Sequence, residues 1–292
     1  LSIRRQRQMC IRDSYSSELI ERRKKLMPFT WNHIYENGKL FGDSLKNSNF
    51  SLTNNKIFSY PGYNEILTGE ADSTINSNAK IYNKNVTVLE KLNQTNNYKN
   101  KIAAFTSWDV FPYIINDKRS GIPVNAGYMQ ESNVNTPVVD YINKNQIRTP
   151  VIWENVRLDV YTHNFALEYI KKKKPKLVYI AYGETDDFAH DGEYDFYINS
   201  LNYTDNMIAE LWNYVQGNKF YKDNTYFIIT TDHGRGLMED WSGHGTSKAS
   251  WLAILGPNIK KTGLVEGKFY TNQIAETIMQ ISKKSKTKIP TD

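Results

Sequence analysis

The chain alternates between short apolar runs of strand length and longer stretches with helical spacing. Strand-like runs occur at 101–108 (KIAAFTSW), 176–182 (KLVYIAY), 226–229 (YFII) and 251–255 (WLAIL). Between and after them, the spacing of amphipathic helices occurs at 136–145, 162–172, 194–215 and 272–281. Strands that alternate with helices predict an α/β fold with a mostly parallel central sheet and helices on both faces.

The apolar run at 226–229 ends in a group of polar residues. Asp232 and His233 follow it, and Gly234 and Gly236 allow the backbone to leave a regular strand there. Neighbouring side chains on a strand point to opposite faces, so both residues can reach one ion only where the strand has ended. In open α/β sheets, ligands bind beyond the carboxyl ends of the strands. The pattern therefore favours a ligand site that includes Asp232 and His233.

A second group of the same kind follows the apolar run at 176–182. Asp186 and His190 are four residues apart, so one helical turn would place the carboxylate and the imidazole on the same side. His244 adds a further imidazole in Ser-Gly-His-Gly. Oxygen and nitrogen ligands without a thiolate suit zinc or manganese, and the number of candidates indicates two ions.

The alternative to a metal site is an ordinary loop, because a lone Asp-His-Gly is more often a loop than a set of ligands. However, three of the chain's five histidines fall in these two groups, which favours the metal site. The other two, His33 and His163, lie in helix-like stretches and are predicted to be packing or surface residues.

The chain carries three motifs in the order Asp-x-x-x-His, Asp-His-Gly and Gly-His-Gly. Together they resemble the motifs of the alkaline phosphatase superfamily, especially its nucleotide pyrophosphatase/phosphodiesterase branch. The resemblance runs from about residue 24 to about residue 282. It implies two divalent metal ions, zinc with manganese as the alternative. One ion would be held by Asp232 and His233, and the other by Asp186, His190 and His244.

A serine precedes a predicted helix that runs from about Pro61 to Thr68 and ends at Gly69. Ser59 would lie at the positive end of this helix, where an anion is favoured. A serine that faces a bound phosphate and a metal ion can act as a nucleophile. The alternative is that Ser59 only caps the helix.

The resemblance extends to this stretch. The phosphodiesterase branch carries Thr-Phe-Pro-Asn where this chain has Ser59-Tyr-Pro-Gly, and Thr-Gly follows at the same spacing in both. Ser59 thus takes the place of the family's nucleophilic threonine, and serine is the nucleophile in alkaline phosphatases themselves. The same stretch partly matches the sulfatase signature Cys/Ser-x-Pro-x-Arg, but Tyr63 stands where that signature has Arg.

Two residues are candidates for substrate binding. Asn78 falls near the position where the family has an asparagine that donates to a phosphate oxygen; the alternative is an ordinary turn asparagine. Arg119 lies in the loop-rich stretch 109–127 together with Phe111 and Tyr113, which could contact a leaving group; the alternative is a packed surface loop.

These residues together predict metal-dependent hydrolysis of a small phosphodiester or phosphomonoester through a phosphoserine on Ser59. The alternatives are a phosphomutase of the same superfamily, similar to phosphoglycerate mutase, a sulfatase, and an inactive remnant that binds phosphate. The resemblance also implies a periplasmic or secreted enzyme. No apolar run approaches the roughly 20 residues of a membrane span.

The first fourteen residues differ from the rest of the chain. They hold four arginines and Cys10, the only cysteine, and resemble translated sequencing-adapter read-through rather than a signal peptide. The competing interpretation is a basic arm for nucleic acid. Without residues 1–14 the net charge falls from +6 to +3, which gives no case for binding nucleic acid, and no disulfide is possible.

We therefore expect residues 15–292 to form a single metallohydrolase domain. The family begins with an apolar strand that ends in a metal-binding Asp, and residues 15–58 contain no such strand. The expectation is that this first strand, its Asp and any export signal are missing, so that the domain is incomplete at its N-terminus.

Overall fold

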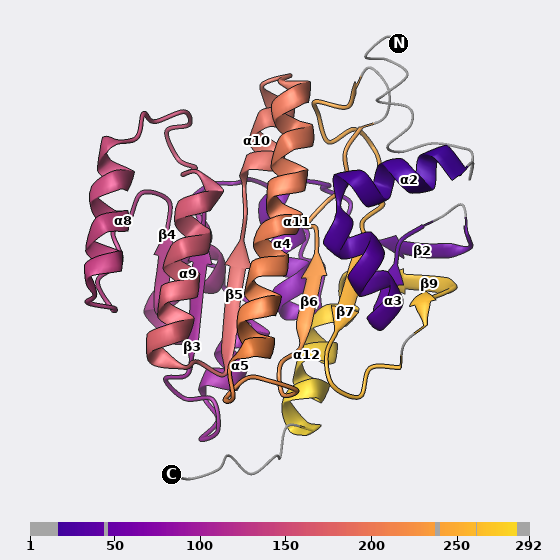
Figure 1. Cartoon of the computed structure of the whole chain (residues 1–292). Coiled ribbons are helices and arrows are strands. Elements are labelled where there is room, and N and C mark those ends of the chain that lie inside the picture. Colours follow the sequence, from indigo (N-terminus) through magenta and orange to yellow (C-terminus); the bar gives the residue numbers. More distant parts are fainter. Residues whose placement is uncertain (1–16, 44–45, 237–239, 261, 285–292) are drawn as a thin grey trace.

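Parallel strands flanked by helices make up the fold, shown in Figure 1 as a computed structural model. It describes residues 17–43, 46–236, 240–260 and 262–284, so residues 1–14 lie outside the described part. One sheet is wholly parallel, in the order β4-β3-β5. Its strands are β3 (Ile102–Thr106), β4 (Val124–Ala126) and β5 (Leu177–Ala181). The predicted α/β class is confirmed.

A second sheet has the order β6-β7-β1-β8. Its strands are β1 (Lys39–Phe41), β6 (Phe227–Thr230), β7 (Leu252–Leu255) and β8 (Gly263–Leu264). Strand β7 runs antiparallel to both β6 and β1, whereas β1 and β8 are parallel. A separate parallel pair joins β2 (Ser48–Ser51) to β9 (Gly267–Tyr270). The strands are thus divided among several sheets, and the strand predicted at 251–255 is antiparallel to its neighbours.

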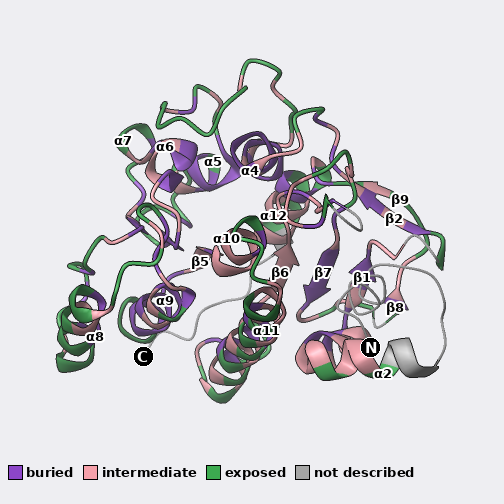
Figure 2. Cartoon of the chain, turned by 90° about the horizontal axis from the view of Figure 1, so that it is seen from above, coloured by how far each residue is buried: buried purple, intermediate pink, exposed green. Residues whose placement is uncertain are grey.

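Helices cover both sides of the strands. The longer helices are α2 (Ser17–Leu26), α4 (Ser59–Thr68), α8 (Pro137–Arg148), α9 (Asp159–Lys173), α11 (Tyr194–Gly217) and α12 (Gln273–Lys284). The shorter ones are η1 (Phe29–Ile34), α3 (Tyr35–Asn37), α5 (Val88–Asn93), α6 (Phe111–Ile115), α7 (Asp117–Ser120) and α10 (Glu184–His190). Seen from above in Figure 2, α9 and α11 lie on one side of the strands, and α4, α5 and α6 lie on the other. All four helices predicted from periodicity are present.

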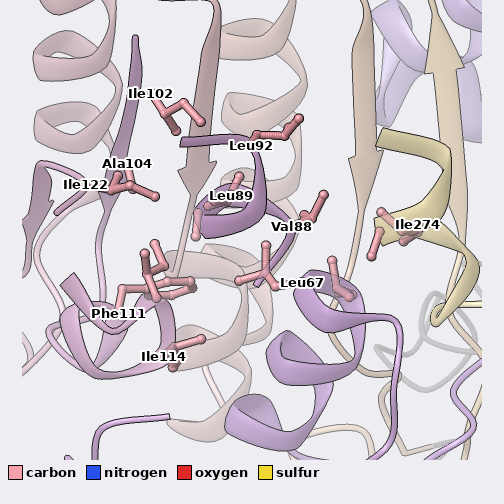
Figure 3. Close-up of a cluster of buried hydrophobic side chains, with 14 of the residues drawn as sticks. Leu67, Val88, Leu89, Leu92, Ile102, Ala104, Phe111, Ile114, Ile122 and Ile274 are labelled. Atoms are coloured by element: carbon pink, nitrogen blue, oxygen red, sulfur yellow. The ribbon is translucent and has the colours of Figure 1, made fainter. Parts of the chain in front are cut away.

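The largest buried cluster packs the helices of one face against the parallel sheet. In Figure 3, Leu67 of α4 and Leu89 of α5 lie between Ile102 of β3 and Ile274 of α12. These four side chains are at most 2% exposed. Burial of such a side chain contributes roughly 1.5–3 kcal/mol, so this cluster fixes α4 relative to the sheet.

Strands β5 and β6 differ from their neighbours in burial. Strands β3 and β7 have a ladder partner on each side and are buried throughout. Strand β5 pairs only with β3, and β6 only with β7, among the strands of the described residues, and both are largely half-buried. A cavity of about 3090 Å³ is lined by every residue from 177 to 182 and from 226 to 231, and it extends to Ser59.

Among the described helices, none combines the length and the apolar character that crossing a bilayer requires. Residues 56–58, directly before α4, do not form a strand. Instead the chain bends there, and Ile57 has a left-handed backbone with φ of 54°. This conformation is unfavourable for a β-branched residue, and it directly precedes the first turn of α4.

Candidate active site

Helix α10 brings two of the predicted metal ligands to one side. His190 Nε2 lies 3.3 Å from Asp186 Oδ2, as expected for residues four apart on a helix. His244 Nε2 lies 3.0 Å from His190 Nε2 and 3.9 Å from Asp186 Oδ1. The three residues offer ligand atoms that all lie within 4.8 Å of one another. Two imidazoles and one carboxylate that converge in this way fit a divalent transition-metal ion.

Asp232 and His233 lie beside this group, just beyond the end of β6. His233 Nε2 is 3.4 Å from Asp232 Oδ2 and 3.7 Å from Asp186 Oδ1. The ring centroids of His233 and His244 are 4.0 Å apart. His233 Nδ1 lies 3.0 Å from the Gly234 carbonyl oxygen, which fits a proton on Nδ1 and a free lone pair on Nε2. That lone pair faces the space between the carboxylates.

Ser59 lies in the same cluster. Its Oγ is 3.3 Å from His233 Nε2, and the residue is 9% exposed. Helix α4 begins at Ser59, and the extended residue Phe58 holds the N-cap position. Ser59 is therefore inside the first turn of the helix rather than its cap. Its hydroxyl is at the positive end of the helix dipole and beside the candidate ligands.

The turn that presents Ser59 is fixed by a chain of hydrogen bonds. Asn54 Oδ1 accepts from the N–H groups of Lys56 and Ile57, at 3.0 and 3.2 Å. The Asn54 side chain donates in turn to the buried carboxylate of Glu65 on α4, at 2.7 Å. Backbone strain of the kind seen at Ile57 persists only where the surroundings determine it, and it is found preferentially at functional sites.

The charges of the cluster shift the pKa values of its carboxyl groups in opposite directions. Burial opposes ionisation of Asp186, but the hydrogen bond from His190 and the nearby His233 and Arg235 outweigh it and lower the pKa of Asp186 to about 2. Burial raises the pKa of Asp232. Burial and the adjacent Asp186 raise the pKa of Asp187 to about 7. Nearby positive charge would therefore stabilise the ionised carboxylates of this cluster.

Arg235 supplies part of this charge, and the sequence analysis did not identify it. Its guanidinium group donates to the Asp186 carboxylate, to the Asp186 carbonyl oxygen at 2.7 Å, and to the Ser242 carbonyl oxygen at 2.8 Å. The available signal was its position directly after Asp-His-Gly. Asp187, which lines the cavity, was missed in the same way although it follows Asp186.

The two predicted substrate-binding residues lie in different surroundings. Asn78 lines the cavity, and its Oδ1 accepts from the N–H of Tyr60 in the first turn of α4, at 3.0 Å. Arg119 is not among the residues that line the cavity. Its guanidinium group pairs with both carboxylate oxygens of Glu90, at 2.8 Å each, and donates to carbonyl oxygens of residues 83–85. The structure thus places Asn78 beside the first turn of α4, which carries Ser59. Arg119, in contrast, does not line the cavity that extends to Ser59.

The remaining histidines lie away from the cluster, as expected from the sequence. His33 stacks on Phe29 with ring centroids 5.0 Å apart. His163 is buried, and its ring nitrogens lie 2.9 Å from the Tyr182 hydroxyl and 3.1 Å from Glu210 Oε2.

The comparison with protein families establishes the family of the chain. The profile of the Metalloenzyme superfamily matches residues 59–283, and the chain therefore belongs to this superfamily. The match begins at Ser59 and includes every candidate metal ligand. A comparison with curated protein sequences gave no match.

Solved structures of the alkaline phosphatase superfamily share the fold. A member from Vibrio parahaemolyticus aligns with a TM-score of 0.56 and 14% identity over 88% of this chain and 60% of its own. The lipoteichoic acid synthase LtaP from Listeria monocytogenes aligns with a TM-score of 0.58 and 14% identity, over 88% and 65%. The alkaline phosphatase from the Antarctic bacterium TAB5 aligns with a TM-score of 0.52 and 14% identity, over 89% of this chain and 94% of its own.

The predicted resemblance to the alkaline phosphatase superfamily is thus confirmed at the level of fold. The nucleotide pyrophosphatase/phosphodiesterase branch stays a prediction. The chain spans less than two thirds of the Vibrio parahaemolyticus protein.

Proposed function

We propose that this chain hydrolyses phosphate esters, with Ser59 as the nucleophile and two divalent metal ions as cofactors. The observation that carries the proposal is the position of Ser59 Oγ, 3.3 Å from His233 Nε2, within the cluster of Asp186, His190 and His244. A serine at the start of a helix, surrounded by convergent ligands and open to a cavity, is an arrangement suited to phosphoryl transfer.

The chain's own residues would divide into two ligand sets. Asp186, His190 and His244 would hold one ion, and Asp232 and His233 would contribute to the second. Zinc fits this set of nitrogen and oxygen ligands, and manganese is the alternative. When bound, the ions supply positive charge that stabilises the phosphate oxygens and makes a hydroxyl group easier to deprotonate. A variant of the TAB5 alkaline phosphatase holds magnesium in one of its sites, which supports divalent ions in this fold.

In the reaction that we propose, Ser59 Oγ attacks phosphorus while the bond from phosphorus to the leaving oxygen breaks. A phosphoserine forms, the Ser59 hydroxyl gives up its proton to solvent, and the leaving group takes up a proton and departs as an alcohol. Water then attacks phosphorus and gives up a proton, the bond to Ser59 Oγ breaks, Ser59 Oγ takes up a proton, and inorganic phosphate or a phosphomonoester is released. The positive end of α4 stabilises the charge on the phosphate throughout.

Asn78 has a supporting role in this proposal. Its Oδ1 is held by the N–H of Tyr60, so the orientation of the amide is fixed relative to Ser59. The amide nitrogen is then available to donate to a phosphate oxygen. Such a donor, fixed before the substrate binds, contributes to the rate because it needs no rearrangement during the reaction.

The substrate class that we propose is a small phosphodiester or phosphomonoester. The solved relatives include the TAB5 alkaline phosphatase and a phosphonate monoester hydrolase from Silicibacter pomeroyi, which aligns with a TM-score of 0.52 and 11% identity over 90% of this chain and 69% of its own. The names of these two relatives support a phosphate ester or a phosphonate ester as the substrate. A periplasmic or secreted location stays a prediction from the resemblance.

The experiment compares turnover of p-nitrophenyl phosphate and bis-p-nitrophenyl phosphate by zinc-loaded protein. Ser59→Ala should lose activity by at least roughly a thousandfold, while the nearby exposed Ser77→Ala should retain it. Faster turnover of the diester would assign a phosphodiesterase, and faster turnover of the monoester a phosphatase. Full turnover by Ser59→Ala would exclude the covalent route, and full turnover after chelation would exclude the metal ions.

A further inference from the structure

Two carboxylates, the buried Asp159 and the half-buried Glu184, connect the start of α9 with the start of α10. Asp159 and Glu184 are the first residues of these helices. Asp159 Oδ1 accepts from the Gly183 N–H at 2.7 Å, and its Oδ2 accepts from the Glu184 N–H at 3.1 Å. Glu184 Oε1 accepts from the Asp159 N–H at 2.7 Å. Each carboxylate therefore satisfies N–H groups at the start of the other residue's helix, which have no partner within their own helix.

This arrangement is unfavourable for the carboxylates themselves. Asp159 is 1% exposed, and burial raises the pKa of both carboxyl groups. The buried guanidinium group of Arg157 donates to Thr162, to Asn125 and to the Met129 carbonyl oxygen rather than to either carboxylate. The hydrogen bonds to the pair thus come from N–H and O–H donors, and Arg157 adds only electrostatic attraction to Asp159, so these hydrogen bonds offset much of the cost of burying the pair.

The pair is also tied to the ends of two strands. The Ser107 hydroxyl donates to Asp159 Oδ1 at 2.5 Å, and the Ser107 N–H donates to the Ala181 carbonyl oxygen at the end of β5, at 2.9 Å. Gly183 also packs closely against its surroundings, since a Cβ atom there would lie 2.8 Å from Val156 Cγ1. The start of α10 is therefore fixed relative to β3 and β5.

Helix α10 needs such an anchor. It has seven residues, and an isolated helix of this length is unstable in water. Asp186 is its third residue and His190 its last, so both candidate ligands depend on where the helix begins and how it is oriented. A shift or rotation at Glu184 would change the distance from both ligands to His244.

We propose that Asp159 and Glu184 are positioning residues that set the metal affinity of the site through α10. This inference rests on the proposed metal-dependent function. Neither residue is a ligand in it, and both act by holding Asp186 and His190 in the geometry that an ion requires. Partners of ligands that lie outside the coordination sphere commonly change metal affinity by about 10–100-fold when they are altered.

The test measures the zinc dissociation constant of the full chain by competition with a chromogenic chelator, and the melting temperature of each metal-free variant. Asp159→Asn and Glu184→Gln preserve size but place an amide NH₂ where N–H donors converge. Each should weaken zinc binding by about 10–100-fold. The double variant should be no weaker than the worse single variant, because the pair acts as one unit.

Asp205→Asn is the matched control. Asp205 is also a buried carboxylate that accepts from backbone N–H groups, those of Phe29 at 2.7 Å and Thr30 at 3.0 Å, but it joins α11 to η1. It should lower the melting temperature and leave the zinc dissociation constant unchanged. An equal loss of zinc affinity in Asp205→Asn would overturn the inference, because general destabilisation would then explain the result.

The remaining outcomes separate this inference from the proposed function. A native chain that binds no zinc contradicts the proposed function. A native chain that binds zinc, with Asp159→Asn and Glu184→Gln within twofold of it, overturns the inference alone. If both variants fail to fold, Ser107→Ala replaces them, since it removes one hydrogen bond to Asp159. It should weaken zinc binding severalfold, and an unchanged constant would overturn the inference.

Discussion

Gly62 of α4 packs directly against the backbone of Asp232. A Cβ atom at Gly62 would overlap the carbonyl oxygen of Asp232 and come within 3.3 Å of its Cβ atom. This contact joins the first turn of α4, which carries Ser59, to the segment after β6, which carries His233. The glycine is therefore what allows the candidate nucleophile and the candidate ligands to lie in one cluster.

Gly62→Ala should separate these two segments. The added methyl group must displace backbone, so we expect a loss of about 1–3 kcal/mol in the free energy of unfolding. We also expect turnover to fall by about a hundredfold, since displacements near 1 Å at a reacting group have effects of that size. Gly217→Ala in α11 is the control, because nothing lies within 4 Å of its Cβ position. Native turnover in Gly62→Ala would show that the contact does not position Ser59.

Arg235→Ala should make the protein more responsive to metal. In the described structure the guanidinium group donates to Asp186, and loss of a hydrogen bond to a charged group costs about 1.5–3 kcal/mol. A bound ion would neutralise the same carboxylate, so the loss should be smaller in zinc-loaded protein. We therefore expect zinc to raise the melting temperature of the variant more than that of the native chain. The exposed Arg148→Ala is the control, and an equal rise in all three proteins would contradict this account.

Arg119→Ala tests whether this arginine contacts substrate or only supports the fold. Glu90 is 3% exposed, so loss of its paired cation leaves a buried charge unpaired and should cost roughly 3 kcal/mol. The KM for p-nitrophenyl phosphate should stay unchanged, because Arg119 does not line the cavity. Replacing Glu90 by Gln in the same protein should restore part of the stability. A KM increase of about tenfold in folded protein would instead support the substrate contact predicted from the sequence.

His163 should make the metal-free protein sensitive to mild acid. Burial lowers the pKa of His163 below its usual value of 6.5, and Glu210 only partly opposes this. Below pH 6.5 the unfolded chain therefore binds a proton that the folded chain does not bind. The contribution of the neutral His163 to the free energy of unfolding is complete above pH 6.5, and it is lost as the pH falls toward the lowered pKa of the folded state.

The measurement is urea unfolding with a chelator present at pH 8 and at pH 5.5. The free energy of unfolding should fall less between these two values in His163→Gln than in the native chain. The comparison at pH 8 shows what the substitution itself costs, because His163 is neutral in both states there. Equal pH dependence in the two proteins would mean that His163 does not contribute to it.

The sequence predicted the parts of the site that depend on local spacing. Asp186 and His190 share one side of α10 because residues four apart always do so on a helix. The position of Ser59 at the start of α4 was predicted from the proline and glycine around it, although the helix begins at Ser59 itself, two residues earlier than expected. Asp159 was not identified, because its link to Glu184 joins residues 25 positions apart and no local pattern marks it.

Strand pairing was harder to predict than strand position. An apolar run indicates a strand but not the direction of its neighbours, so the antiparallel pairing of β7 with β6 was not foreseen. Nor does such a run show how many neighbours a strand has, and β5 and β6, each with one described neighbour, are less buried than β3 and β7. The bend at Ile57 arises from hydrogen bonds to Asn54, which lies three residues earlier but is itself held by Glu65.

The cavity beside β5 has a consequence for hydrogen exchange. In a parallel ladder, successive residues direct their N–H groups alternately to the two neighbouring strands. In β5 one set of amides is bonded to β3, whereas the other set faces the side on which no described strand pairs. Amide protection measured along Leu177–Ala181 should therefore alternate, with slow exchange toward β3 and exchange many times faster toward the cavity. Exchange rates along this one strand would thus report both the stability of the sheet and the access of water to the cavity.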